Sequence, residues 1–180
     1  MFTDGKEFKM LKKLLVALVA AFASIIHFTV GMGDLRVSFG IIVFVLALYF
    51  NEDMEPIPSA IITGIAVFLM RVIVVAISGD VATNLVVSYL LEVLFYIGYG
   101  IIYEFVVRHD NVKESDPLVL LLMICDFGGN ALELTARYLF LGDQFQSLTL
   151  QNLFLAAFIR SALVWIIIKI LKNQKRITES

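Results

Sequence analysis

Long apolar runs separated by short polar connections dominate the chain. We expect six helical spans, at residues 11–30, 36–50, 56–78, 84–107, 117–141 and 151–171. A helix needs about 20 apolar residues to cross about 30 Å of hydrocarbon. Five of the runs approach that length, whereas the second is shorter and is expected to be short, tilted or partly re-entrant. Prolines open the third and fifth runs, in the first turn where a helix tolerates them.

Composition supports this pattern. The hydrophobic class makes up 60% of the 180 residues and charged residues only 17%, with a mean hydropathy of +0.91. We therefore expect an all-α integral membrane bundle of six transmembrane helices, forming one domain over residues 1–180 with a cytoplasmic tail at 172–180. That length leaves no room for a separate soluble enzyme domain. A net charge of −2 gives no sign of a nucleic-acid partner.

The distribution of lysine and arginine predicts the orientation. Basic residues precede the first span, lie between the fourth and fifth, and follow the sixth, whereas the opposite side has only Arg36 near its boundary. By the positive-inside rule both termini are cytoplasmic, in a multi-pass protein of the cell membrane, bacterial by expectation. The start also imitates a secretory signal around Ala21-Phe22-Ala23. We favour an uncleaved helix, because the apolar run continues past that point.

Ionisable residues within the apolar spans are the most informative feature. A charge at mid-bilayer costs at least ~2.5–3.5 kcal/mol, so such groups face a bundle interior or a wet cavity. Six residues are of this kind: Arg71, Glu92, Asp126, Glu133, Arg137 and Arg160. From a rise of ~1.5 Å per residue, four of them from four helices lie at one level in the outer half. In the fifth span, Asp126, Asn130, Glu133 and Arg137 share one helical face.

Two interpretations compete for these charges. They could be structural ion pairs, for example Arg71 with Glu92 and Glu133 with Arg160. Alternatively they line a polar cavity, open to the outside, that binds a small solute. We favour the cavity, because ion pairing needs only two helices. Its ligand-binding candidates are Arg71, Glu92, Tyr96, Asp126, Asn130, Glu133, Arg137 and Arg160.

The first span carries a second pattern, in which Ala17 and Ala21 form a small-xxx-small pair that permits close helix contact in lipid. Internal packing and docking of a partner membrane protein remain open for this face. We expect no enzyme activity, metal or cofactor. Cys125 is the single cysteine, and His27 and His109 are far apart in sequence, so no metal-ligand spacing arises.

Several of these residues resemble a known family. KKLLVALVAA at 12–21 is followed by a short loop, then DLRVSFGI at 34–41, a proline-bearing turn and a helix ending in an arginine. This resembles the substrate-binding S components of energy-coupling factor transporters. The resemblance implies a six-helix fold, uptake of a vitamin-type ligand in the outer half under the loop at 31–35, and docking of a transmembrane coupling subunit and its ATPases through Ala17 and Ala21. No motif identifies the ligand.

The same stretch, with ICDF at 124–127 and FIRSALVW at 158–165, also resembles the N-terminal membrane sensor region of clostridial-type sensor histidine kinases. That resemblance implies a sensor or input module without a catalytic domain, in which residues 169–180 begin a connector. The two alternatives differ in output rather than in architecture.

Overall fold

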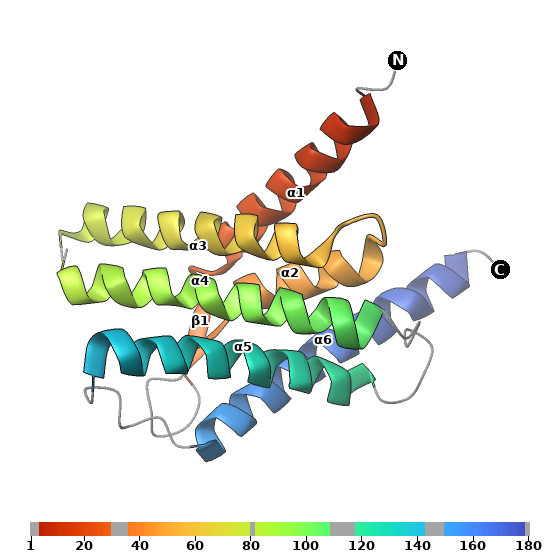
Figure 1. The fold of residues 1–180 in the computed structure, drawn as a ribbon. Coiled ribbons are helices and arrows are strands. Elements are labelled where there is room, and N and C mark those ends of the chain that lie inside the picture. Colours follow the sequence, from red (N-terminus) through yellow and green to blue (C-terminus); the bar gives the residue numbers. More distant parts are fainter. Residues whose placement is uncertain (1–3, 30–35, 80–81, 109–117, 143–149, 179–180) are drawn as a thin grey trace.

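The computed structural model describes residues 4–29, 36–79, 82–108, 118–142 and 150–178. The elements in order are α1 (Asp4–Ala23), β1 (His27–Thr29), β2 (Arg36–Ser38), α2 (Phe39–Phe50), α3 (Pro56–Ser78), α4 (Thr83–Tyr103), a π-helical turn η1 (Glu104–Arg108), α5 (Leu118–Leu141) and α6 (Leu150–Thr178). Apart from the β1–β2 hairpin, the described part is helical (Figure 1). The expected loop at 31–35, His109 and Pro117 lie outside the described residues.

Four of the helices are long and apolar enough to cross a membrane. They occupy Pro56–Ser78, Thr83–Arg108, Leu118–Phe140 and Gln151–Ile177. Helix α2, with 12 residues, is only about 18 Å long at ~1.5 Å per residue, which is less than the hydrocarbon thickness. Helix α1 has 20 residues, but charged side chains crowd its first half. The described residues therefore contain four candidate spans, whereas the sequence predicted six.

The first predicted span is wrong at its far end. Helix α1 starts at Asp4 and stops at Ala23, so residues expected to extend the helix to position 30 instead turn and form β1. β1 pairs antiparallel with β2 in the register His27↔Ser38, Phe28↔Val37 and Thr29↔Arg36. The pairing satisfies backbone groups that a helix would otherwise have satisfied. It also takes the first three residues of the predicted second span.

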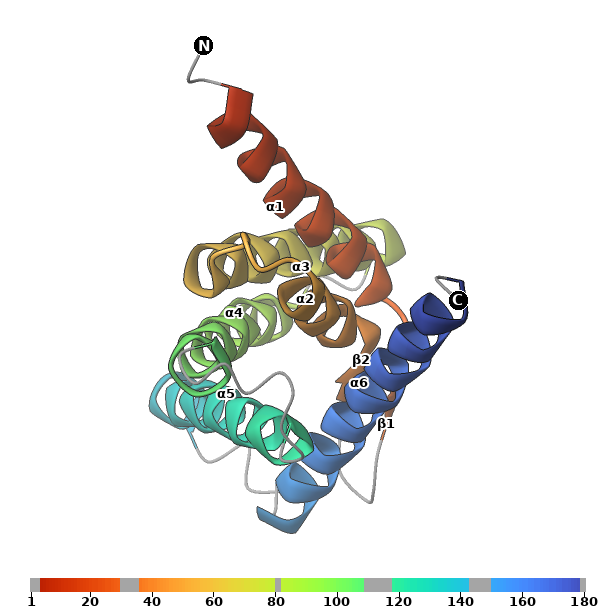
Figure 2. The same ribbon diagram turned by 90° about the vertical axis from the view of Figure 1, so that its right-hand side faces the viewer.

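Helix α4 lies between α3 and α5 (Figures 1 and 2). Small residues let these three helices approach closely. A Cβ placed on Gly100 would lie 2.5 Å from Ala60 Cβ of α3, and one on Gly129 of α5 would lie 2.7 Å from the Phe95 carbonyl oxygen of α4. Helices α1 and α2 pack on α3, and α6 packs on α5 while touching α2. The hairpin inserts Val37 among Leu153 and Ala156 of α6.

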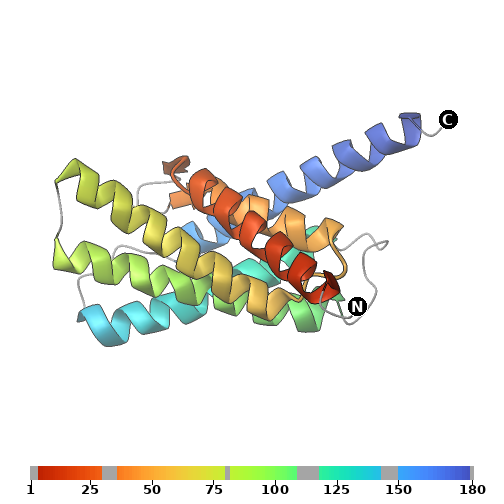
Figure 3. The same ribbon diagram turned by 90° about the horizontal axis from the view of Figure 1, so that it is seen from above.

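The start of α1 and the end of α6 project from the same end of the molecule (Figures 1 and 3). At that end Lys13 Nζ lies 2.7 Å from Glu55 Oε2 and ties α1 to the start of α3. The Lys13 ammonium holds the pKa of the exposed Glu55 carboxyl below its ordinary value. Arg108 of η1 donates hydrogen bonds to the carbonyls of Glu52 and Met54, at 3.0 and 2.7 Å. The basic residues of α1, η1 and α6 thus lie at one end of the bundle, and the sequence predicted that they would share one side.

Candidate functional site

The six charged residues predicted to face the interior do so. We call them the polar layer: Arg71, Glu92, Asp126, Glu133, Arg137 and Arg160. Their side chains are 1% to 16% exposed. They form three ion pairs, each of one arginine and one carboxylate, so the layer carries no net formal charge. Burial of this kind is tolerated because each charge has a partner at hydrogen-bond distance.

The first pair joins Arg71 of α3 to Glu92 of α4, as one of the two sequence-based interpretations predicted. An Arg71 Nη1 hydrogen bond to Glu92 Oε2 closes the pair. The guanidinium also lies over the Tyr89 ring, 5.5 Å from its centroid, which is within the range of a cation–π contact. Arg71 is therefore fixed by two residues on neighbouring turns of α4.

The second pair lies within α5. Glu133 Oε1 accepts hydrogen bonds from Arg137 Nε at 2.8 Å and from Nη2 at 2.5 Å. Arg137 also donates to the hydroxyl of Ser88 and, at 2.9 Å, to its carbonyl oxygen, which ties α5 to α4. The suggested pairing of Glu133 with Arg160 is wrong. Glu133 instead pairs with Arg137, because residues four apart on a helix are neighbours on one face.

The third pair joins α5 to α6. Arg160 Nη2 donates to Asp126 Oδ1 at 2.6 Å. Asn130 Nδ2 donates to the same oxygen at 2.7 Å and to the Asp126 carbonyl at 2.8 Å. The Arg160 guanidinium lies over the Phe95 ring of α4, with 5.1 Å between Cζ and the centroid. This pair is the most deeply buried of the three.

One face of α4 receives all three pairs. Ser88, Glu92 and Phe95 follow at i, i+4 and i+7, and Tyr99 continues the stripe at i+11. Each of the first three contacts a different arginine. The spacing of Ser88, Glu92, Phe95 and Tyr99 is a signal that could have located this stripe from the sequence. Tyr96, a predicted ligand-binding candidate, instead packs edge-on against Phe44 and Phe95 in the core.

Two separate hollows adjoin the polar layer. We call the first the outer groove: it lies at the end opposite the basic residues, has a free volume of about 80 Å³, and is lined by Ser24, Ile25, His27, Arg71, Val74, Val75 and Tyr89. That volume has room for several water molecules. His27 Nδ1 lies 3.0 Å from the Ile25 carbonyl oxygen. Only Arg71 among the predicted ligand-binding residues lines this groove.

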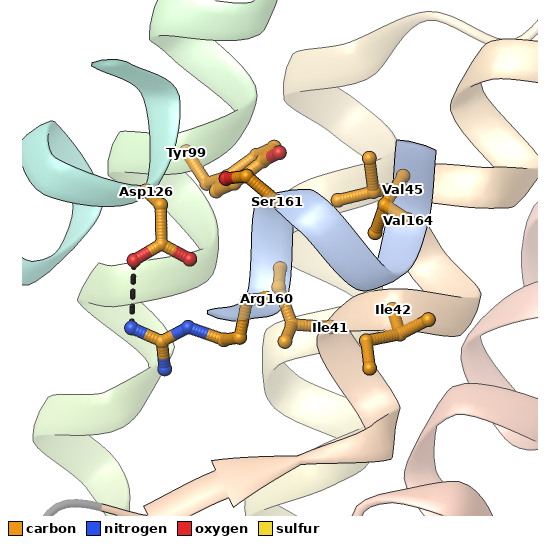
Figure 4. A pocket seen from close by; sticks show the side chains of 8 residues that line it. All are labelled: Ile41, Ile42, Val45, Tyr99, Asp126, Arg160, Ser161 and Val164. Carbon is orange, nitrogen blue, oxygen red and sulfur yellow. Dashed lines mark hydrogen bonds and ion pairs between the residues drawn. The ribbon is translucent and has the colours of Figure 1, made fainter. Parts of the chain in front are cut away.

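The second hollow, which we call the central hollow, lies among α2, α4, α5 and α6 (Figure 4). Asp126, Arg160, Ser161 and Tyr99 line one side of it, and aliphatic side chains of α2 and α6 line the other. The space encloses no void large enough for a water molecule. Asp126 and Arg160 were predicted site residues, whereas Ser161 was missed because it carries no charge and the sequence argument rested on ionisable residues.

The described residues form two small hollows and not the single, ligand-sized cavity that the sequence predicted. Ligand pockets for drug-sized molecules usually have about 300–1,000 Å³, and the two hollows are smaller and separate. The reason is that each arginine finds a carboxylate or a hydroxyl on an adjacent helix, which draws the helices together. Glu92, Asn130, Glu133 and Arg137 line neither of the two hollows and serve the ion pairs.

The small-residue face of α1 is used inside this chain. Ala17, Ala20 and Ala21 are buried, and a Cβ on Gly40 of α2 would lie 2.7 Å from the Ala20 carbonyl oxygen. Of the two alternatives left open for this face, internal packing is the one realised. The residues of α1 that remain exposed are large and apolar, such as Leu15 and Leu18.

Metal-ligating side chains do not cluster within the described ranges, where no group of three or more His, Cys, Asp or Glu is positioned to hold an ion. Cys125 is buried. Comparison of the chain with protein-family models, with curated proteins and with solved structures found no match.

Proposed function

We propose that this chain is a membrane-embedded protein that binds a small polar solute from the side opposite its basic end. The observation that carries the proposal is Arg71. Its guanidinium is buried among apolar helices, paired with Glu92, and lines the outer groove. A charge placed at such depth costs free energy, and a groove with room for solvent gives that charge access to a ligand. No other described residue combines membership of the polar layer with a place in this groove.

The proposed arrangement in the membrane is that of a six-helix, multi-pass protein of a bacterial cytoplasmic membrane. Helices α3 to α6 would cross it fully. Helices α1 and α2 would extend into the membrane from the cytoplasmic side. The β1–β2 hairpin would connect them in the outer half of the bilayer. The start of α1 and the end of α6 lie at one end, where Lys13 and Arg108 also contact the connection before α3, and this supports cytoplasmic termini.

The resemblance to S components makes transport the favoured output, with a coupling transmembrane subunit and ATPases as partners. In that case the solute would be held in the outer groove near Arg71. A vitamin-sized molecule would need the groove to widen, since about 80 Å³ is below the volume of a typical small-molecule site. The coupling subunit would meet the exposed side of α1, because Ala17 and Ala21 face inward.

The experiment is to purify the protein gently into lipid nanodiscs and to identify, by native mass spectrometry, the small molecules that remain bound to it. We expect one retained solute, lost at least about tenfold in Arg71→Met, because one charge-assisted contact is worth about 1.5–3 kcal/mol. Arg176→Met is the matched control. It removes the same charge from the exposed end of α6 and should leave the solute in place. Equal retention by both variants would refute the outer groove as the binding site.

A sensor or input module is the second candidate. The observation that favours it is α6, which runs for 29 residues and projects beyond the bundle with its basic end (Figure 1). A transport subunit would keep uptake when residues 172–180 are deleted. A sensor with the same deletion would still bind the solute but would no longer pass its signal to the cytoplasm. Uptake of the retained solute by cells carrying the deletion distinguishes the two.

A further inference from the structure

Two adjacent residues of α6 carry buried polar atoms that no described residue satisfies. Arg160 Nε and Ser161 Oγ have no hydrogen-bond partner within the described part of the chain. Ser161 is 2% exposed, and the Arg160 side chain is 8% exposed. Six buried side-chain N or O atoms of the described residues lack a partner, and among them only Arg160 Nε and Ser161 Oγ belong to residues that line one of the two hollows. Buried polar groups in folded proteins are nearly always hydrogen-bonded, so two such atoms beside a hollow point to a missing partner there.

Both atoms belong to residues that line the central hollow. In Figure 4, Asp126, Tyr99, Arg160 and Ser161 lie together, and Val45, Val164 and Ile42 lie across from them. The hollow therefore has a polar side and an aliphatic side. A molecule that fits both sides has a polar group at one end and an apolar edge at the other.

The charges around the hollow decide what that polar group can be. Asp126 already neutralises Arg160 at 2.6 Å, so an added anion or cation would be buried without a counter-charge, which is costly. Arginine nitrogens are hydrogen-bond donors only, whereas a serine hydroxyl both donates and accepts. The ligand therefore needs a hydrogen-bond acceptor and no net charge.

We propose that the central hollow is a binding site for a small uncharged molecule with a carbonyl-type acceptor and an apolar edge. The acceptor takes hydrogen bonds from Arg160 Nε–H and Ser161 Oγ–H, and the apolar edge contacts Val45 and Val164. The site is distinct from the outer groove and shares no lining residue with it. Because the hollow in this conformation does not admit a free water molecule, binding requires the aliphatic side chains of α2 and α6 to move apart.

Three probes of similar length test the charge and acceptor requirements: butanamide, butyrate and butylammonium, of which the last lacks a carbonyl. Binding to the full chain in nanodiscs is measured by saturation-transfer NMR at constant pH and salt. We expect butanamide to bind, and the two charged probes to bind at least about tenfold more weakly, because each would bury an unpaired charge. Butyrate or butylammonium binding as tightly as butanamide would overturn the proposal.

Ser161→Ala tests the location. This variant removes an unpartnered hydroxyl without adding volume, and we expect it to weaken butanamide about tenfold, the worth of one hydrogen bond to a buried donor. Ser78→Ala is the matched control at the exposed end of α3 and should change nothing. Failure of all three probes to bind, or equal binding of butanamide to Ser161→Ala, overturns the proposal. The two hollows share no lining residue, so the outcome of this test and that of the outer groove are independent.

Discussion

Arg160 contacts three helices through one side chain. It pairs with Asp126 of α5, lies over Phe95 of α4 and starts from α6. Removing one member of such a buried pair leaves the other charge buried without compensation. The stability lost in this way exceeds the net stability that the intact pair contributes. At the scale of single residues, each charge of the polar layer therefore depends on its partner for burial, and the pairs do not act as independent stabilising contacts.

This gives a prediction for the Asp126–Arg160 pair. Arg160→Met should lower the free energy of unfolding by about 3–5 kcal/mol, because Asp126 is left buried and charged. The double variant Asp126→Leu/Arg160→Met should be more stable than Arg160→Met alone, since no charge remains unpaired. Unfolding in mixed detergent micelles followed by circular dichroism measures both. A double variant less stable than the single one would contradict this account.

At the scale of elements, close approach of helix backbones explains why glycines cluster on α4 and α5. A Cβ on Gly129 would meet the Phe95 carbonyl oxygen at 2.7 Å, and a backbone atom cannot rotate away. A Cβ on Gly128 would meet only the Ile102 side chain, chiefly Cδ1 at its flexible far end. The two neighbouring glycines therefore have different reasons to be small.

The alanine variants of Gly128 and Gly129 should therefore differ in how much stability they lose. We expect Gly129→Ala to destabilise the fold by about 1–3 kcal/mol through overpacking, despite alanine's better helix propensity. Gly128→Ala should cost less than about 1 kcal/mol, because Ile102 can change rotamer and the helix gains propensity. Thermal unfolding of both variants in the same detergent checks this. Equal losses would mean that α4 and α5 do not approach as described.

The contact of α1 with α2 yields a further prediction. Ala21→Leu should lower the free energy of unfolding by about 1–3 kcal/mol, because Ala21 is buried in a closely packed contact. Leu18→Ala is its control, since Leu18 is 51% exposed and its truncation opens no cavity. If Ala21→Leu left stability intact and removed a copurifying membrane partner, the face would be an intermolecular one after all.

At the scale of the whole molecule, the start of α1 and the end of α6 lie at one end (Figure 1), the end at which Lys13 and Arg108 contact the connection before α3, and this defines an axis. Pairing of Lys13 with Glu55 and of Arg108 with the carbonyls before α3 fastens the connections at that end. The opposite end holds the outer groove. Under the positive-inside rule, we propose that the end with the basic residues faces the cytoplasm.

Cysteine labelling tests the direction. In a Cys125→Ser background, we expect Asn84→Cys, at the exposed start of α4, to react with a membrane-impermeant maleimide on intact cells. Glu52→Cys, at the other end, should react only after the cells are opened, because the cytoplasmic side is shielded by the membrane. The reverse pattern would invert the proposed topology and place the outer groove inside the cell.

The sequence by itself determined features whose causes are local. Helix α3 begins at Pro56 and ends at Ser78 as predicted, because prolines open it and Gly79 adopts φ of 81° at its end. Which charges face inward also followed from the sequence, since an apolar run makes any other placement costly. Tertiary structure decided the rest. The hairpin after Ala23, the partner of each arginine and the size of the hollows depend on which helix surfaces meet, and residues far apart in the chain set those contacts only once they have packed.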